Sequence, residues 1–357
     1  MSLRFLSGLA LVASGVLAPL GAQQVRGTVL TAEGARPLSG ALVSLADSAG
    51  RVVLRTATSP SGAWLLTAPR EGRWIVRVAA IGFAPSRPDT VALMLGAPVA
   101  LRTTLTVQPF VLPEIVASDD RSRCTPNPTA ADAVRRVLGE AETALRLVEA
   151  TIAGGRLAFD TEYIERRWIA GTADTVVRTS RQTARAAWPV ATADPALLER
   201  DGFMRDDPLL TPTIGYSGDA GPTYYAPDVG VLFAPWFVAS HCFALEPGAE
   251  DELVLRYVPD GSRKQVEVGG TLVLDRASLA LRRLTFQFVG LPRWVPASAA
   301  EGELVFQVLP GGEWAPMRWR LRAPIRLERR ALGAASREGF GGWVELAGQV
   351  LAVAPGR

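Results

Sequence analysis

Residues 264–289 constrain the fold of this chain more than any other stretch, because apolar and polar side chains alternate along them. One parity carries Val266, Val268, Leu272 and Leu274, and the other carries Gln265, Glu267, Thr271 and Asp275. A period of two is typical of a strand with one buried face. Residues 275–278 predict a tight turn, and a change of phase at Arg282 and Arg283 predicts a β-bulge. Neighbouring segments repeat the alternation, so we expect this hairpin inside a large antiparallel sheet.

The size and charge of the chain limit what it can be. At 357 residues, 48% of them hydrophobic, it can form two domains with their own cores. Lysine and arginine total 38 against 35 aspartates and glutamates, and Lys264 is the only lysine. A nucleic-acid partner would require basic residues clustered against few acids. We therefore expect no nucleic-acid partner.

The N-terminus has the features of a secretory signal peptide. Arg4 is followed by an apolar run over 5–17, and Leu20, Gly21 and Ala22 suit cleavage after Ala22. The run is too short for a comfortable membrane span, and we find no transmembrane span in the mature chain. Residues 1–22 are therefore expected to direct export to the periplasm or the extracellular space.

Residues 24–108 consist of short apolar segments separated by glycine and proline turns. The expected strands are 25–30, 41–45, 51–58, 63–66, 74–78 and 98–107. Short strands with turn signals at regular intervals predict a β-sandwich.

Several motifs in this segment agree in order with one known family. They are 27–29 (GTV), 37–41 (PLSGA), 61–64 (SGAW), 72–74 (GRW) and 81–83 (IGF). The segment resembles a carboxypeptidase regulatory-like domain, which implies a transthyretin-like (prealbumin-like) sandwich. The resemblance implies an accessory module without catalytic residues of its own. Residues 110–118 resemble the segment that follows this domain in TonB-dependent outer-membrane receptors, although an ordinary edge strand would fit as well. We place a linker at 109–123.

The second domain is expected to span residues 124–357. Residues 129–151 have apolar side chains at helical spacing, namely Val134, Val137, Leu138, Ala141, Leu145 and Val148. The remainder alternates as strands at 157–169, 175–188, 242–245, 252–258, 303–309, 314–327 and 343–353, with a short helix at 195–200. The predicted class is therefore mainly β: a transthyretin-like sandwich, one helix and a large antiparallel sheet. Residues 270–275 resemble the half-barrel sheets of periplasmic lipoprotein carriers, so a half-barrel is one form we consider.

Two cysteines, Cys124 and Cys242, are present in a chain expected to be exported. An even cysteine count in that setting predicts a disulfide, although two separate buried thiols would also satisfy the sequence.

The sequence contains few residue types suited to catalysis. His241 is the only histidine, and its neighbour Cys242 would point to the opposite face of a strand. A nucleophile needs its base within hydrogen-bond reach, so this pair does not predict one. Asp228 and Asp275 both fit turns better than acid–base work, and ligands for zinc are too few. We expect no enzymatic activity, no cofactor and no metal requirement.

Two clusters are candidates for ligand binding. Arg318, Arg320 and Arg322 alternate with apolar residues and could bind an anion, or could be the wet face of a sheet. Tyr225, Phe233, Trp236 and Phe237 could line an apolar ligand groove, or could cover the core.

The sequence thus predicts an exported cell-envelope binding or accessory protein without catalytic activity. The alternative is a periplasmic carrier that holds an apolar or lipid ligand in a curved sheet, and a hydrolase comes third. The expected partners are an envelope or outer-membrane protein, or a lipid. A deep apolar hollow would favour the carrier, and a filled one the accessory protein.

Overall fold

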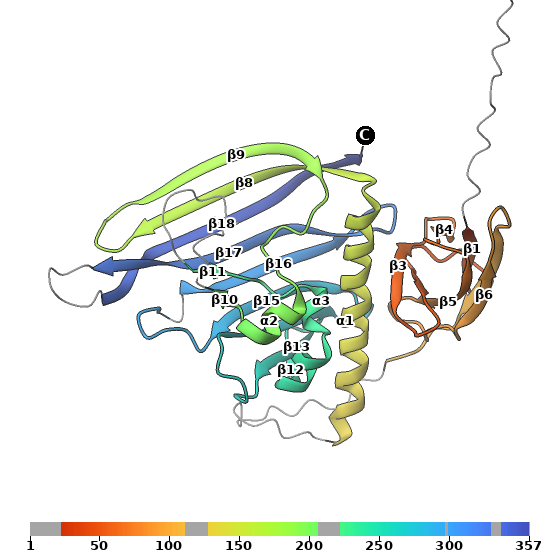
Figure 1. Ribbon diagram of the computed structural model, residues 1–357, viewed down its shortest axis with the longest axis horizontal. Coiled ribbons are helices and arrows are strands. Elements are labelled where there is room, and N and C mark those ends of the chain that lie inside the picture. The colour runs from red at the N-terminus through yellow and green to blue at the C-terminus, as the bar shows by residue number, and fades with distance from the viewer. Residues whose placement is uncertain (1–22, 111–127, 206–221, 297–298, 330–336, 357) are drawn as a thin grey trace, which may run out of the picture.

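The computed structural model describes residues 23–110, 128–205, 222–296, 299–329 and 337–356 (Figure 1). The expected signal peptide, most of the expected linker and Cys124 lie outside the described residues. Within these ranges the fold is mainly β, with a few helices, as the sequence predicts.

The N-terminal part is a sandwich of two sheets. Its strands are β1 (Gln24–Thr31), β2 (Leu42–Ala46), β3 (Val52–Ala57), β4 (Ala63–Thr67), β5 (Gly72–Ala79), β6 (Asp89–Leu93) and β7 (Val99–Leu105). One sheet has the order β4-β1-β7, with β1 and β7 parallel, and the other has the order β3-β2-β5-β6. Alternating residues such as Val25, Trp64 and Trp74 fill the space between the sheets. The sequence did not predict β6, because only Val91 and Leu93 of its five residues are buried.

The long helix α1 (Pro128–Gly154) follows, and Gly155, with φ +60°, ends it. Gly155 has no side chain to oppose this left-handed conformation, so the chain can turn into the next strand. Three short helices and one short strand pair also occur: α2 (Pro195–Asp201), α3 (Val229–Leu232), α4 (Pro235–Ser240), and β10 (Met204–Arg205) with β11 (Thr223–Tyr224). The sequence did not predict this pair, which is too short to show a pattern.

The largest sheet within the described residues is antiparallel and has nine strands in the order β12-β13-β14-β15-β16-β17-β18-β8-β9. Its strands are β8 (Leu157–Ile169), β9 (Thr175–Arg185), β12 (His241–Pro247), β13 (Glu252–Pro259), β14 (Glu267–Asp275), β15 (Leu281–Val289), β16 (Glu301–Val308), β17 (Trp314–Arg329) and β18 (Arg337–Pro355). Strands β12 and β9 are the two edges, so the sheet is open and not a closed barrel.

The hairpin that the alternation predicted is β14–β15, near the middle of this sheet. Asp275 accepts hydrogen bonds from the backbone N–H groups of Ala277 and Ser278 and so fixes the turn. The register shifts where Leu274 pairs with Leu281 and Val273 pairs with Arg283, so the bulge lies at Arg282. Both the turn and the bulge confirm the prediction.

One face of the sheet, here called the helix face, is covered by the helices. Leu255, Leu272, Leu284, Leu304 and Trp319 are consecutive cross-strand partners on it, and all are buried. Large rings on this face lie over glycines: a Cβ added to Gly348 would collide with the Trp319 indole. Glycine in β18 is therefore required by this close approach.

Helix α1 lies between the sandwich and the large sheet (Figure 1) and contacts both. Leu42 of β2 belongs to the same buried cluster as the helix residues. The buried Glu140 carboxylate accepts a hydrogen bond of 3.0 Å from the Gly82 N–H, and Arg55 pairs with Glu149 at 3.2 Å. Helix α1 thus packs on two sides, against the sandwich and against the large sheet. The single apolar stripe in its sequence predicts only one packed side.

Candidate functional site

The four aromatic residues proposed for an apolar groove pack against the core of the second domain. Phe237 is fully buried, Tyr225 is 6% exposed, and Phe233 and Trp236 are half-buried. The Phe237 ring lies 6.3 Å from Phe203 and stacks on His241 at 3.6 Å. Aromatic side chains of the protein itself therefore cover this part of the helix face, where the sequence suggested a ligand groove.

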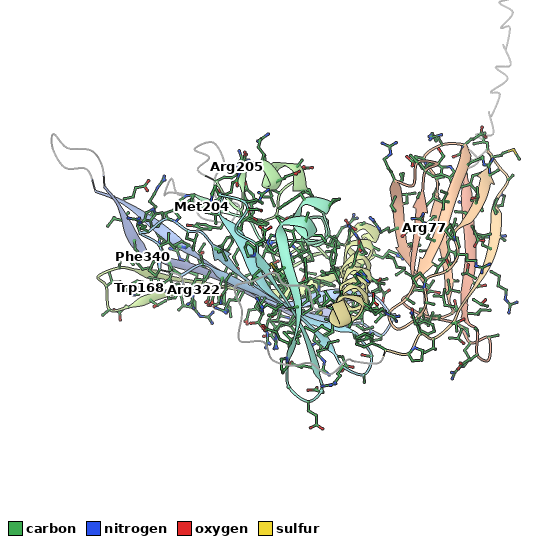
Figure 2. All side chains as sticks on the ribbon, turned by 90° about the horizontal axis from the view of Figure 1, so that it is seen from below. Arg77, Trp168, Met204, Arg205, Arg322 and Phe340 are labelled. Carbon is green, nitrogen blue, oxygen red and sulfur yellow. The ribbon has the colours of Figure 1, made fainter. Side chains whose placement is uncertain are left out.

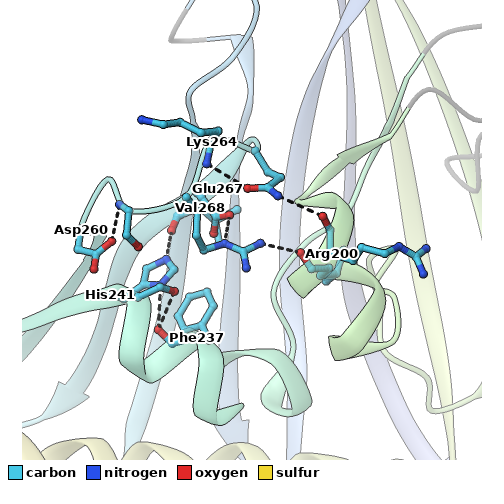
Figure 3. A network of polar contacts seen from close by, with 12 residues as sticks. Arg200, Phe237, His241, Asp260, Lys264, Glu267 and Val268 are labelled. Atoms are coloured by element: carbon cyan, nitrogen blue, oxygen red, sulfur yellow. Dashed lines mark hydrogen bonds and ion pairs between the residues drawn. The ribbon is translucent and has the colours of Figure 1, made fainter.

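His241 belongs to a polar network where α4 meets the sheet (Figure 3). Its Nδ1 lies 2.9 Å from the Phe237 carbonyl oxygen, and its Nε2 lies 2.9 Å from the Val268 carbonyl oxygen. Burial lowers the pKa of His241, while the two carbonyl acceptors oppose that shift. The imidazole links a helix to a strand and has two backbone neighbours.

Cys242 follows His241, the first residue of β12, and is the cross-strand partner of Val258. Its expected partner, Cys124, lies outside the described residues, so the pairing remains a prediction.

The same network contains an ion pair between Arg263 and Glu267, 2.6 Å apart. Arg263 also donates to the Leu198 carbonyl oxygen at 3.0 Å and lies over the Trp236 ring at 4.7 Å. Burial raises the pKa of Glu267, whose side chain is 4% exposed, although Arg263 opposes the shift. This pair fixes α2 and α4 against the end of the sheet.

Asp228 and Asp275 belong to separate local structures. Asp228 caps α3 by accepting from the Val231 N–H at 2.9 Å, and burial raises its pKa. Hydrogen bonds from the Ser278 N–H and hydroxyl lower the pKa of Asp275 to about 2. Each carboxylate serves its own turn, and no contact joins the two.

Arg318, Arg320 and Arg322 lie on the face of β17 away from the helices, here called the open face. Arg320 is 2.7 Å from Glu301, and Arg322 is 2.8 Å from Glu345. Arg318 is exposed and has no ion-pair partner within the part of the chain that is described. Two of the three arginines are therefore neutralised by carboxylates, which weakens the case for an anion site.

Glu345 is the centre of this charged row, because it contacts three guanidinium groups and its side chain is only 5% exposed. Besides Arg322, its partners are Arg166 at 2.8 Å and Arg320 at 3.5 Å. Burial alone would raise the pKa of Glu345, but the hydrogen bonds and charge of Arg322, Arg166 and Arg320 lower it below its usual value. The row is a network of ion pairs in which Arg166, Arg320 and Arg322 share the carboxylates of Glu301 and Glu345.

A groove of about 440 Å³ opens on the same face, beside this row. Gly269, Gly270 and the hydroxyls of Thr271 and Thr285 form part of its lining, and the two hydroxyl oxygens are 2.7 Å apart. Arg256, Arg320, Gln287, Glu301 and Glu303 supply its polar side chains. The sequence does not predict this groove, because the groove depends on which strands are neighbours in the sheet.

Farther along the open face lie three half-buried aromatic side chains, here called the aromatic platform: Trp168, Phe340 and Trp343. Trp168 and Trp343 are cross-strand partners, and the Trp168 and Phe340 rings are 6.1 Å apart. Arg322 lies over the Trp343 ring at 4.6 Å. Figure 2 shows Trp168, Arg322 and Phe340 close together, far from the sandwich. A signal existed in the sequence, since Trp168 and Trp343 have the parity of polar residues in their strands.

No group of three or more His, Cys, Asp or Glu side chains in the described ranges is placed to hold a metal ion. None of the described helices is long and apolar enough to cross a membrane.

The carboxypeptidase regulatory-like domain model matches residues 24–106. This confirms the resemblance, and the chain carries such a domain as its N-terminal sandwich. No curated protein matches the chain.

Solved structures give only distant likenesses. The pilus 2b backbone protein of group B streptococcus is 13% identical, with 24% of this chain and 41% of that chain covered and a TM-score of 0.20. A streptococcal ancillary pilin is 12% identical, with 47% and 51% covered and a TM-score of 0.22. A 9R-lipoxygenase from Cyanothece is 10% identical, with 79% and 41% covered and a TM-score of 0.17. This chain spans about half or less of those chains, and such TM-scores support no argument about fold or function.

Proposed function

We propose that the mature chain is an exported cell-envelope binding or accessory protein without catalytic activity. The observation that carries the proposal is the filled helix face. Phe203, Tyr224 and Phe237 are buried there and pack against the sheet, where a carrier would leave a hollow. A ligand or partner would instead meet the open face, whose side chains reach solvent.

The N-terminal domain supports an accessory role through its contacts with the rest of the chain. The Ser39 hydroxyl donates to the Gly311 carbonyl oxygen at 3.4 Å, and Glu140 accepts from Gly82. The sandwich is thereby attached to both α1 and the β16–β17 turn. We propose that it supports the larger domain and does not act as a separate binding module.

Purification of the chain from its native envelope, followed by mass spectrometry, tests this function. We expect envelope protein or polymer to co-purify, and no stoichiometric lipid. If one lipid molecule per protein remained bound after purification without a delipidation step, this result would contradict the accessory role and support a carrier.

The carrier remains the second candidate because of one observation. On the helix face, beyond the helices, Ile325, Val344 and Leu346 are half-buried and Leu327 is 38% exposed. Covering these side chains with an acyl chain would be favourable, since the burial of apolar surface stabilises by roughly 25 cal/mol per Å².

Export is part of the proposal and has its own test. We expect the mature protein to begin at Gln23, without an acyl group, in the periplasm or outside the cell. Intact-mass measurement of the exported fraction would contradict this if residues 1–22 or a lipid adduct remained.

A further inference from the structure

The aromatic platform is unusual for the wet face of a sheet. Its rings do not belong to either buried core cluster, yet Trp168 is held in one orientation by its indole N–H, which donates to the Thr172 carbonyl oxygen at 3.1 Å. An aromatic ring held in place with part of its surface exposed can contact an apolar ligand face with little loss of side-chain entropy.

The polar side chains next to the platform are close to balanced in charge, because the five arginines Arg166, Arg256, Arg318, Arg320 and Arg322 stand against the four glutamates Glu246, Glu301, Glu303 and Glu345. Arg166, Arg320 and Arg322 face Glu301 and Glu345, and Arg256 pairs with Glu246 farther along the sheet. An anion on this surface would meet the carboxylates, and a cation would meet the arginines. The surface therefore favours a ligand without net charge.

These groups can still form hydrogen bonds with such a ligand. Arg166 and Arg320 are 38% and 35% exposed, and each guanidinium has five N–H donors, more than its carboxylate partners use. Glu303 is half-buried in the groove lining and has no ion-pair partner within the described ranges. Together with the Thr271 and Thr285 hydroxyls, they offer donors and acceptors side by side.

The two parts lie on one continuous surface. Arg320 lines the groove and contacts Glu345, Glu345 contacts Arg322, and Arg322 covers the Trp343 ring. From β13 to β8 the surface crosses six strand spacings, or roughly 29 Å at about 4.8 Å each. The groove volume is within the range of small-molecule sites, about 300–1,000 Å³.

We propose that the open face binds a neutral, linear polysaccharide, which rests on the proposed function as an envelope-binding protein. Sugar rings have one apolar C–H face that can stack on Trp168 and Phe340. Their hydroxyl groups both donate and accept, as the groove side chains do. A neutral chain rich in hydroxyl groups leaves the ion pairs of these arginines, and the net charge of the surface, unchanged.

Calorimetric and tryptophan-fluorescence titrations of the full mature chain test the proposal, with cellohexaose, maltohexaose and N-acetylchitohexaose as probes. We expect at least one of them to bind. Trp168→Ala combined with Phe340→Ala should weaken binding at least about tenfold. Leu65→Ala removes a side chain that is 51% exposed in the sandwich and is the control that should leave binding unchanged.

Glu303→Gln provides a second variant whose folding is not at risk, because the carboxylate has no ion-pair partner in the described ranges. It should weaken binding about threefold or more, since a hydrogen bond to a charged carboxylate is replaced by a weaker one to a neutral amide. Binding of none of the three probes, or binding that neither variant alters, would overturn the proposal. Binding restricted to heparin or to anionic lipid vesicles would overturn it as well. A co-purifying envelope protein with no glycan binding would leave the proposed accessory function standing and remove only this ligand.

Discussion

The two faces of the large sheet differ in polarity, although successive residues of one strand point alternately to one face and the other. On the helix face, Leu255, Leu272, Leu284, Leu304 and Trp319 are consecutive cross-strand partners. The adjacent row on the open face is Arg256, Thr271, Thr285, Glu303 and Arg320. The first row is buried in the core and the second reaches solvent, so substitutions on the two faces should affect different properties.

Phe237→Ala should have the largest effect on stability. The ring is fully buried between Phe203, His241 and Tyr257, and loss of a buried phenylalanine costs about 3–5 kcal/mol. Trp343→Ala on the open face is the comparison, and it should cost much less. Denaturant titrations of both variants measure the difference, and equal losses would refute the contrast between the faces.

The predicted disulfide should attach the helix layer to the sheet. Cys242 is at the start of β12, and Cys124 precedes α1 in the sequence. Closing so long a loop stabilises by about 4–5 kcal/mol at most, so we expect Cys242→Ser to cost roughly 2–4 kcal/mol. Reductant should lower the unfolding midpoint of the second domain and leave that of the sandwich unchanged. Non-reducing peptide mapping that finds both thiols unmodified in exported protein would disprove the bond.

Glu345→Ala tests whether the open face also contributes to stability. The substitution leaves three arginines close together without their shared carboxylate. We expect a loss of about 1–3 kcal/mol, less than for a fully buried pair, because the guanidinium groups are partly solvated. Glu303→Ala on the same face should be nearly neutral. A Glu345 variant as stable as the wild type would show that the network does not contribute to the free energy of unfolding.

The smallest effect should come from His241, which joins α4 to β14. Because burial lowers its pKa in the folded protein, the unfolded chain binds the proton more readily between the two pKa values. Stability from this group is complete above the unfolded pKa of about 6.5 and decreases as pH falls through the lower folded pKa. Melting curves from pH 7.5 to 5 of the wild type and of His241→Gln measure it. An unchanged pH slope in the variant would exclude His241 as its source.

The sequence predicted the second domain well wherever one strand face is buried. The period of two identified β14 and β15, and the phase change at Arg282 located the bulge. The short pair β10–β11 and the strand β6 were missed, since neither has enough buried residues to show a period. The same limit applied to the candidate sites. The arginine row was found from its spacing, but not the carboxylates that neutralise it.

The sequence by itself determined most of the order of elements, the sandwich family and the two faces of the strands that show a period, because these depend on local periodicity and on motifs of adjacent residues. Only the tertiary structure decided what each face does. Glu301 and Glu345 come from different strands than Arg320 and Arg322, and Trp168 meets Trp343, which lies 175 positions later in the sequence. Such pairs form when the sheet sets its strand order and register, which depend on long-range packing and leave no trace in local spacing.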